Sequence, residues 1–153
     1  MRTPSLRETA AFVRKAQKGA VADGEPRWLR SMAVVNLLPT VLPGIKVTHE
    51  ERQVALLRDI LRTSAETEDS LLQAGFPAAV VASVIRLTRF DTGFGYLEHL
   101  RVVAESDDLA AKRVAMAVLL REEERAGASG RDTEEGRARR GKAIAVMRRG
   151  LGY

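Results

Sequence analysis

The stretch Val-Ala-Leu-Leu-Arg-Asp-Ile-Leu-Arg-Thr-Ser, residues 54 to 64, decides the fold. Its apolar residues recur at helical spacing on most sides, which predicts a buried helix. Arg58, Asp59 and Arg62 stand within this helix. Because an unpaired buried charge is costly, they predict a polar cavity or a compensated ion network. Cavities are where function usually lies, so the stretch also marks a candidate site.

The composition limits the kind of protein this can be. A length of 153 residues with 45% hydrophobic content fits one domain spanning 1–153. The chain has no cysteine, which excludes disulfides, thiolate metal sites and thiol nucleophiles. No segment resembles a signal peptide or a membrane span, so we expect a soluble, cytoplasmic protein without a membrane partner.

The net charge of +5 raises the question of nucleic-acid binding. Much of the excess lies near the C-terminus, where it predicts a solvated helix face. Only 5% of residues are aromatic, so no stacking platform for bases is visible. Nucleic acid is therefore not the favoured partner.

The chain reads as helical throughout, and no alternating strand pattern is found. A turn-rich segment spans 20–27, and Thr48 predicts the N-cap of the central helix. A helix ending near Leu120 is followed by a polar connector, and 127–153 form this connector and a basic C-terminal helix packed on the domain. The other helices are expected at residues 4–18, 28–38, 67–72, 80–87 and 96–103.

Common catalytic signatures are missing. The chain has no phosphate-binding glycine loop and no His-Glu-x-x-His motif. His49 and His99 lie far apart, and both are interpreted as structural residues on helix edges. A histidine-based metal site is therefore not expected.

Several segments resemble a known family in the right order. They are residues 11–19 (Ala-Phe-Val-Arg-Lys-Ala-Gln-Lys-Gly), 24–35 (Gly-Glu-Pro-Arg-Trp-Leu-Arg-Ser-Met-Ala-Val-Val), 55–61 (Ala-Leu-Leu-Arg-Asp-Ile-Leu), 72–76, 84–89, 96–100 and 112–120 (Lys-Arg-Val-Ala-Met-Ala-Val-Leu-Leu). Over most of residues 8 to 125 the chain resembles the HD-domain phosphohydrolases, closest to the RelA/SpoT-like branch that hydrolyses guanosine tetraphosphate (ppGpp). The resemblance implies an all-α fold, a single-domain HD-like helical bundle.

The metal-binding positions depart from the family pattern. The resemblance implies histidines at the positions of Arg30 and Arg58, an aspartate at Asp59 and another at Val118. Protonated arginine cannot ligate a metal and valine has no donor atom. We therefore expect the family metal, manganese, to be lost, with no catalytic, metal or cofactor-binding residue remaining.

Other departures gather around the same cleft. Arg62 and Thr63 replace the Glu-Asp pair that the resemblance places beside the hydrolytic water. Gln17 replaces a histidine, Ser31 a proline, and 121–122 (Arg-Glu) a His-Asn pair near the nucleotide. Substitutions confined to one cleft indicate a pseudoenzyme or a repurposed scaffold, whether natural or engineered.

Two interpretations of the altered cleft concern its charges. In one, Arg30, Arg58, Arg62 and Arg121 form a cationic pocket that binds a guanine nucleotide without cleaving it. In the other, these arginines pair with Asp59, Glu122 and Glu123 and merely neutralise a former metal cavity. The residues alone leave both open.

A third interpretation concerns the aromatic rim of the cleft. Trp28, Phe90, Phe94 and Tyr96 are most of the few aromatic residues, and aromatics with arginines are typical interface anchors. Core positions are the alternative for Trp28 and Tyr96. The leading expectation is a non-catalytic protein-binding module, and the alternatives are binding of a ppGpp-like nucleotide or residual metal-dependent phosphohydrolase activity.

Overall fold

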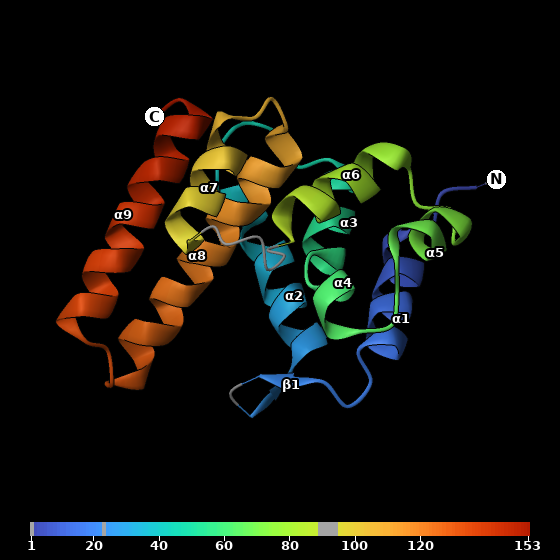
Figure 1. The fold of residues 1–153 in the computed structure, drawn as a ribbon, viewed down its shortest axis with the longest axis horizontal. Coiled ribbons are helices and arrows are strands. Elements are labelled where there is room, and N and C mark those ends of the chain that lie inside the picture. The colour runs from blue at the N-terminus through green and yellow to red at the C-terminus, as the bar shows by residue number, and fades with distance from the viewer. Residues whose placement is uncertain (1, 23, 89–94) are drawn as a thin grey trace.

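A computed structural model describes residues 2–22, 24–88 and 95–153 of the chain, and nearly all of its regular structure is helical (Figure 1). The helices are α1 (Leu6–Ala16), α2 (Arg27–Leu37), the 3-10 helix η1 (Leu38–Thr40), α3 (His49–Leu57), α4 (Ile60–Thr63), α5 (Glu68–Gln73), α6 (Ala78–Leu87), α7 (Tyr96–Glu105), α8 (Leu109–Ser129) and α9 (Glu134–Leu151). The predicted all-α class is confirmed. Within the predicted turn at 20–27, β1 (Val21–Ala22) and β2 (Glu25–Pro26) form a two-residue antiparallel pair that the sequence pattern does not predict.

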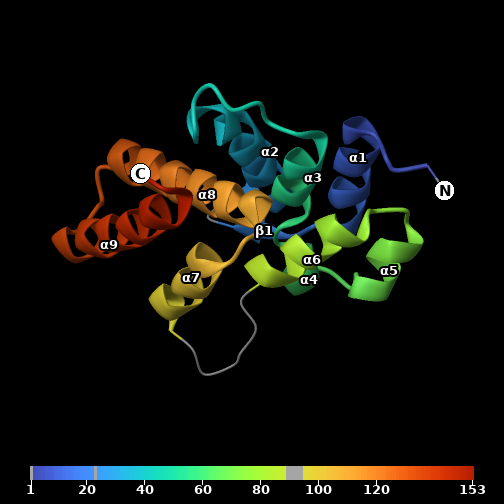
Figure 2. The same cartoon turned by 90° about the horizontal axis from the view of Figure 1, so that it is seen from above.

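The long helix α8 lies between two groups of helices. It packs against α2 and α3 on one side and against α6 and α7 on another, while α1 packs on α3 (Figure 2). The chain ends lie at opposite ends of the longest axis (Figure 1). Of the helices in the described ranges, none is both long and apolar enough to cross a membrane.

The deciding stretch is buried as predicted, but it is not one helix. Its apolar side chains are almost fully buried except for the partly buried Leu61, whereas the backbone leaves the helix at Arg58 and Asp59, between α3 and α4. Asp59 has φ −101° and ψ −1°, and its carbonyl accepts hydrogen bonds from the amide and the hydroxyl of Thr63 at 3.1 and 2.7 Å. The Thr63 side chain, at the end of α4, thus bonds back across one turn to the backbone of Asp59. The charged pair lies at the corner between α3 and α4.

The predicted N-cap at Thr48 is confirmed. Its hydroxyl accepts from the amide of Glu51 at 3.1 Å, and the Glu51 carboxylate accepts from the amide of Thr48 at 3.3 Å. This reciprocal pair is a capping box, which satisfies donors that a helix start would leave unpaired. It fixes where α3 begins.

The helix predicted to end near Leu120 continues to Ser129, because residues 121–126 (Arg-Glu-Glu-Glu-Arg-Ala) are nearly all strong helix formers. It ends where Gly130 adopts φ 68°, a left-handed conformation that suits glycine. The connector predicted from residue 127 is therefore shorter. Beyond it, α9 packs on α7 and α8, with Ala143 and Met147 buried.

A buried arginine holds α8 to the loop between α2 and α3. Arg113 has no exposed surface, and its guanidinium forms an ion pair with Glu51 at 3.1 Å. It also donates to the carbonyls of Leu38, Ile45 and Lys46, at 3.2, 2.7 and 3.2 Å. The side chain thus satisfies loop carbonyls that would otherwise be buried without donors.

Replacing Arg113 by methionine should lower the free energy of unfolding by about 3–5 kcal/mol, because Glu51 would remain as an uncompensated buried charge. Urea denaturation measures the change. Adding Glu51→Gln should recover part of the loss by removing that charge, while Arg137→Met, at an exposed position on α9, should be nearly neutral. A loss below about 1 kcal/mol in the Arg113 variant would contradict a structural role for the ion pair.

Candidate functional site

The corner between α3 and α4 opens onto a small cavity of about 210 Å³. The cavity lies among the corner, the end of α6, α7 and α8. Its lining residues are Arg58, Asp59, Arg62, Leu87, Tyr96, His99, Leu100, Val114, Ala115, Val118 and Glu122. Val114, Ala115 and Val118 of α8 form an apolar wall. The charges come from the corner and from Glu122, one turn further along α8.

Asp59 is neutralised within the cavity. Its carboxylate lies 3.0 Å from Nη1 of Arg58 and 3.9 Å from Nη1 of Arg27. The Arg58 side chain is only 15% exposed, and its Nε is buried without a hydrogen-bond partner among the described residues. The aspartate thus has the arginine partner that the neutralised-cavity interpretation expects, and Arg58 keeps one donor unused.

Glu122 carries the second carboxylate of the cavity. Burial raises the pKa of this carboxyl above its ordinary value. The positive charges of Arg58, Arg30 and Arg140 oppose the shift, and the negative charge of Asp59 adds to it. These residues come from α2, the corner, α8 and α9, so one electrostatic network joins four parts of the chain.

Only some of the other predicted site residues line this cavity. Arg62 lines the cavity, is exposed, and makes no ion pair with any described residue. Arg121 does not line it: the guanidinium pairs with Glu124 at 3.5 Å instead. Tyr96 lines the cavity and is also packed partly buried against the core. Phe90 and Phe94 lie outside the described residues.

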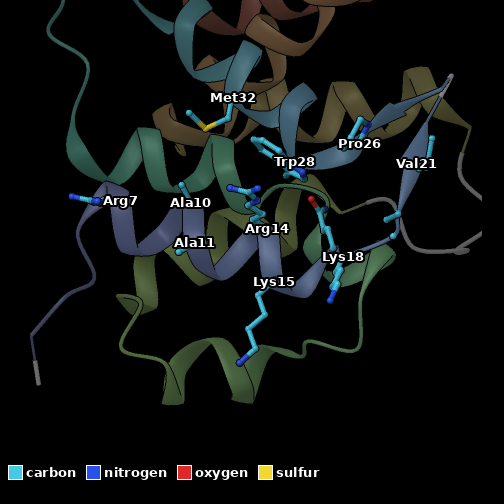
Figure 3. A pocket seen from close by; sticks show the side chains of 13 residues that line it. Arg7, Ala10, Ala11, Arg14, Lys15, Lys18, Val21, Pro26, Trp28 and Met32 are labelled. Atoms are coloured by element: carbon cyan, nitrogen blue, oxygen red, sulfur yellow. The ribbon is translucent and has the colours of Figure 1, made fainter.

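Trp28 belongs to a different hollow, a groove of about 740 Å³ between α1, α2 and the β1–β2 hairpin (Figure 3). The guanidinium of Arg14 lies over its ring, 4.8 Å from the centroid. Trp28 and Tyr96 therefore do not share one rim.

Two residues of the cavity are not among the predicted binding residues. The sequence analysis names Glu122 only as a counter-ion of the cleft arginines, and its position one turn after Val118 follows from the helical spacing of four. His99 is interpreted as a helix-edge residue, yet it lines the cavity with its Nε2 3.3 Å from the carbonyl oxygen of Leu87. The spacing of three between Tyr96 and His99 is the signal that could have placed both there.

The side chains around Asp59 do not fit a divalent cation. The positions that the family resemblance would assign to ligands hold Arg30, Arg58, Asp59 and Val118, and the one carboxylate is occupied by a guanidinium. Within the ranges that the structure covers, no three or more His, Cys, Asp or Glu residues group so that they could hold a metal ion. Two permanent positive charges also repel a cation.

Comparison with solved structures identifies the fold. The chain superposes on a metazoan ortholog of SpoT, a protein that hydrolyzes ppGpp and plays a role in starvation responses. The TM-score is 0.72 at 18% sequence identity, and the match covers 97% of this chain and 89% of the other. The fold is that of the HD-domain ppGpp hydrolases, as predicted. No protein-family profile and no curated protein sequence matches the chain.

The raised pKa of Glu122 predicts a pH-dependent stability. Between the ordinary carboxyl pKa and the raised one, the folded state binds more protons than the unfolded state, so stability falls as pH rises through this window. Glu122→Gln should therefore raise the melting temperature at neutral pH, by at most about 2–4 °C, and the difference should vanish toward pH 4. Thermal unfolding followed by circular dichroism measures this.

The control is Glu124→Gln, at an exposed position on the same helix, which should leave the melting temperature nearly unchanged at every pH. A Glu122→Gln variant that melts below the parent at neutral pH would mean that attraction to the arginines exceeds the cost of burying the carboxylate.

Proposed function

We propose that this chain is a non-catalytic interaction module on the fold of the ppGpp hydrolases, and that it binds a protein partner at the rim of the altered cavity. The observation that carries the proposal is the Arg58–Asp59 ion pair at 3.0 Å. It sets a permanent positive charge beside the one carboxylate that the family resemblance assigns to a metal. These side chains therefore do not provide the ligands of a metal that would activate a hydrolytic water.

The rim supplies the groups that protein interfaces use. Arg62 is exposed beside the cavity without an ion-pair partner in the described ranges, and the half-buried Tyr96 also lines the cavity. A neighbouring hollow of about 420 Å³ shares Tyr96 and Glu122 and extends to Arg139 and Arg140 of α9. Arginine and tyrosine are enriched among the residues that dominate binding energy at interfaces. A partner at this face would contact both hollows.

Metal analysis and a hydrolysis assay test the non-catalytic part of the proposal. Purified protein supplied with manganese should retain no stoichiometric metal and should release no pyrophosphate from ppGpp. A photo-crosslinking residue at position 62 should capture a discrete protein from cell extract, and the same residue at exposed position 137 on α9 should not. Metal-dependent turnover would overturn the proposal in favour of a phosphohydrolase, and equal capture at both positions would remove the cavity rim as the interface.

Binding of a guanine nucleotide is the second candidate function, and the unused donors favour it. The buried Nε of Arg58 has no partner, and Arg62 makes no ion pair among the described residues, so two guanidinium groups could bind phosphate oxygens. The cavity volume of about 210 Å³ argues against a whole nucleotide, because ligand pockets usually enclose ~300–1,000 Å³. A nucleotide would therefore lie partly outside it.

Titration calorimetry with ppGpp and with GDP tests this candidate. Binding should weaken roughly tenfold in Arg58→Ala, which corresponds to about 1.4 kcal/mol. It should strengthen in Glu122→Gln, because that variant removes a carboxylate from the phosphate site. If neither nucleotide binds, the protein-partner proposal stands alone.

A further inference from the structure

The groove between α1 and α2 is separate from the cavity, and its cations make no ion pair with the residues that the structure describes. Four cations line it: Arg7, Arg14, Lys15 and Lys18. None forms an ion pair with a described residue, although most ion pairs of the molecule involve arginine. No carboxylate is found among the described residues that line the groove. The groove is therefore a concentrated positive surface that the fold itself does not neutralise.

The cations are arranged along a line. The spacing of seven places Arg7 and Arg14 on one face of α1, and Lys18 follows in the turn after the helix. Figure 3 shows Arg7 and Lys18 toward opposite ends of the groove, with Arg14 over Trp28 between them. Arg7 and Lys15 alone are roughly 12 Å apart along the helix. An array of this length matches an extended partner better than one phosphate group.

The floor of the groove is apolar. Trp28 and Met32 stand one turn apart on α2, and Val21 and Pro26 of the hairpin continue the floor. Val21 is 57% exposed and Met32 is 37% exposed. Tryptophan, methionine and arginine are enriched at protein interfaces, and methionine adapts its shape to the partner. These residues suit apolar side chains of a peptide.

The lining of the groove suits neither a small anion nor a nucleic acid. All four cations are exposed, and the buried Gln17, which also lines the groove, already donates from its Nε2 to the hydroxyl of Thr63 at 2.8 Å. The described lining therefore offers no free buried side-chain donor to enclose a small anion. Among the described residues, one aromatic ring lines the groove, and a guanidinium already covers one face of it. Successive bases of a nucleic acid would lack a stacking platform.

We propose that this groove docks an acidic amphipathic helix of a partner protein, with its carboxylates on Arg7, Arg14 and Lys18 and its apolar residues on Trp28 and Met32. The complementary helix carries acidic residues at the same spacing of seven and four, next to an apolar stripe. Such helix-in-groove docking uses apolar anchors for affinity, and the opposite charges give specificity and fast association. This site is independent of the cavity and of the function proposed there.

Fluorescence anisotropy with defined probes tests the proposal. The probe is a fluorescein-labelled 16-residue helical peptide with glutamates on one face and leucines beside them. A peptide with lysine in place of every glutamate and a labelled 15-nucleotide oligouridine are the comparison ligands. The acidic peptide should bind, the lysine peptide should not, and added salt should weaken the complex.

A pair of charge-reversal variants isolates the groove. Arg14→Glu with Lys18→Glu should weaken binding of the acidic peptide about tenfold or more. Arg137→Glu with Lys142→Glu changes the net charge equally at exposed positions on α9 and should change affinity less than about twofold. Arg62→Ala should have no effect on the peptide, so failure of the cavity proposal would leave this result unchanged.

Several outcomes would overturn the proposal. Equal weakening by both double variants would show attraction to net charge alone, and absence of peptide binding would remove the helix-docking role. Tighter binding of oligouridine, lost in the groove variant, would assign the groove to single-stranded nucleic acid. Concentration-dependent dimerisation in sedimentation velocity, abolished by the groove variant, would make a second copy of this chain the occupant.

Discussion

The ion pair between Arg113 and Glu51 is the constraint on which the rest of the structure depends. Glu51 caps α3 through Thr48 and at the same time neutralises an arginine with no exposed surface. Through the same guanidinium, α8 holds the backbone of the loop that follows α2. Three helices and their connection are thus fixed relative to one another by one side chain, and the cavity is built on two of them.

Electrostatics within the cavity depend on parts of the chain that are distant in sequence. Arg58 and Asp59 pair at the corner between α3 and α4, and the hydroxyl of Thr63 donates to the carbonyl of Asp59 at the same corner. Glu122 then feels charges from α2 and α9 as well. A change of charge at any of these positions should alter the protonation of that carboxyl, because the network is shared.

The sequence predicts the helical class, the buried deciding stretch and the α3 cap, because these follow from periodicity and from local capping chemistry. It also points to Arg58 and Asp59, which the structure joins. Other features depend on three-dimensional packing. The break in the helix, the burial of Arg113 and the separation of Trp28 from Tyr96 require knowing which elements meet. The cations of the groove recur in the sequence, but that they make no ion pair with any described residue appears only in the fold.

The position of Arg113 on α8 separates the residue that stabilises the helix packing from the residues that line the cavity. Residues 114, 115, 118 and 122 of the same helix line the cavity, whereas Arg113 reaches the loop on nearly the opposite side. The ion pair that fixes the helices and the residues that would perform chemistry are thus on different faces. Exchange of a cavity side chain therefore leaves the contacts of the Arg113–Glu51 ion pair in place. On this helix, the lining of the cavity and the anchor of the fold are separate sets of residues.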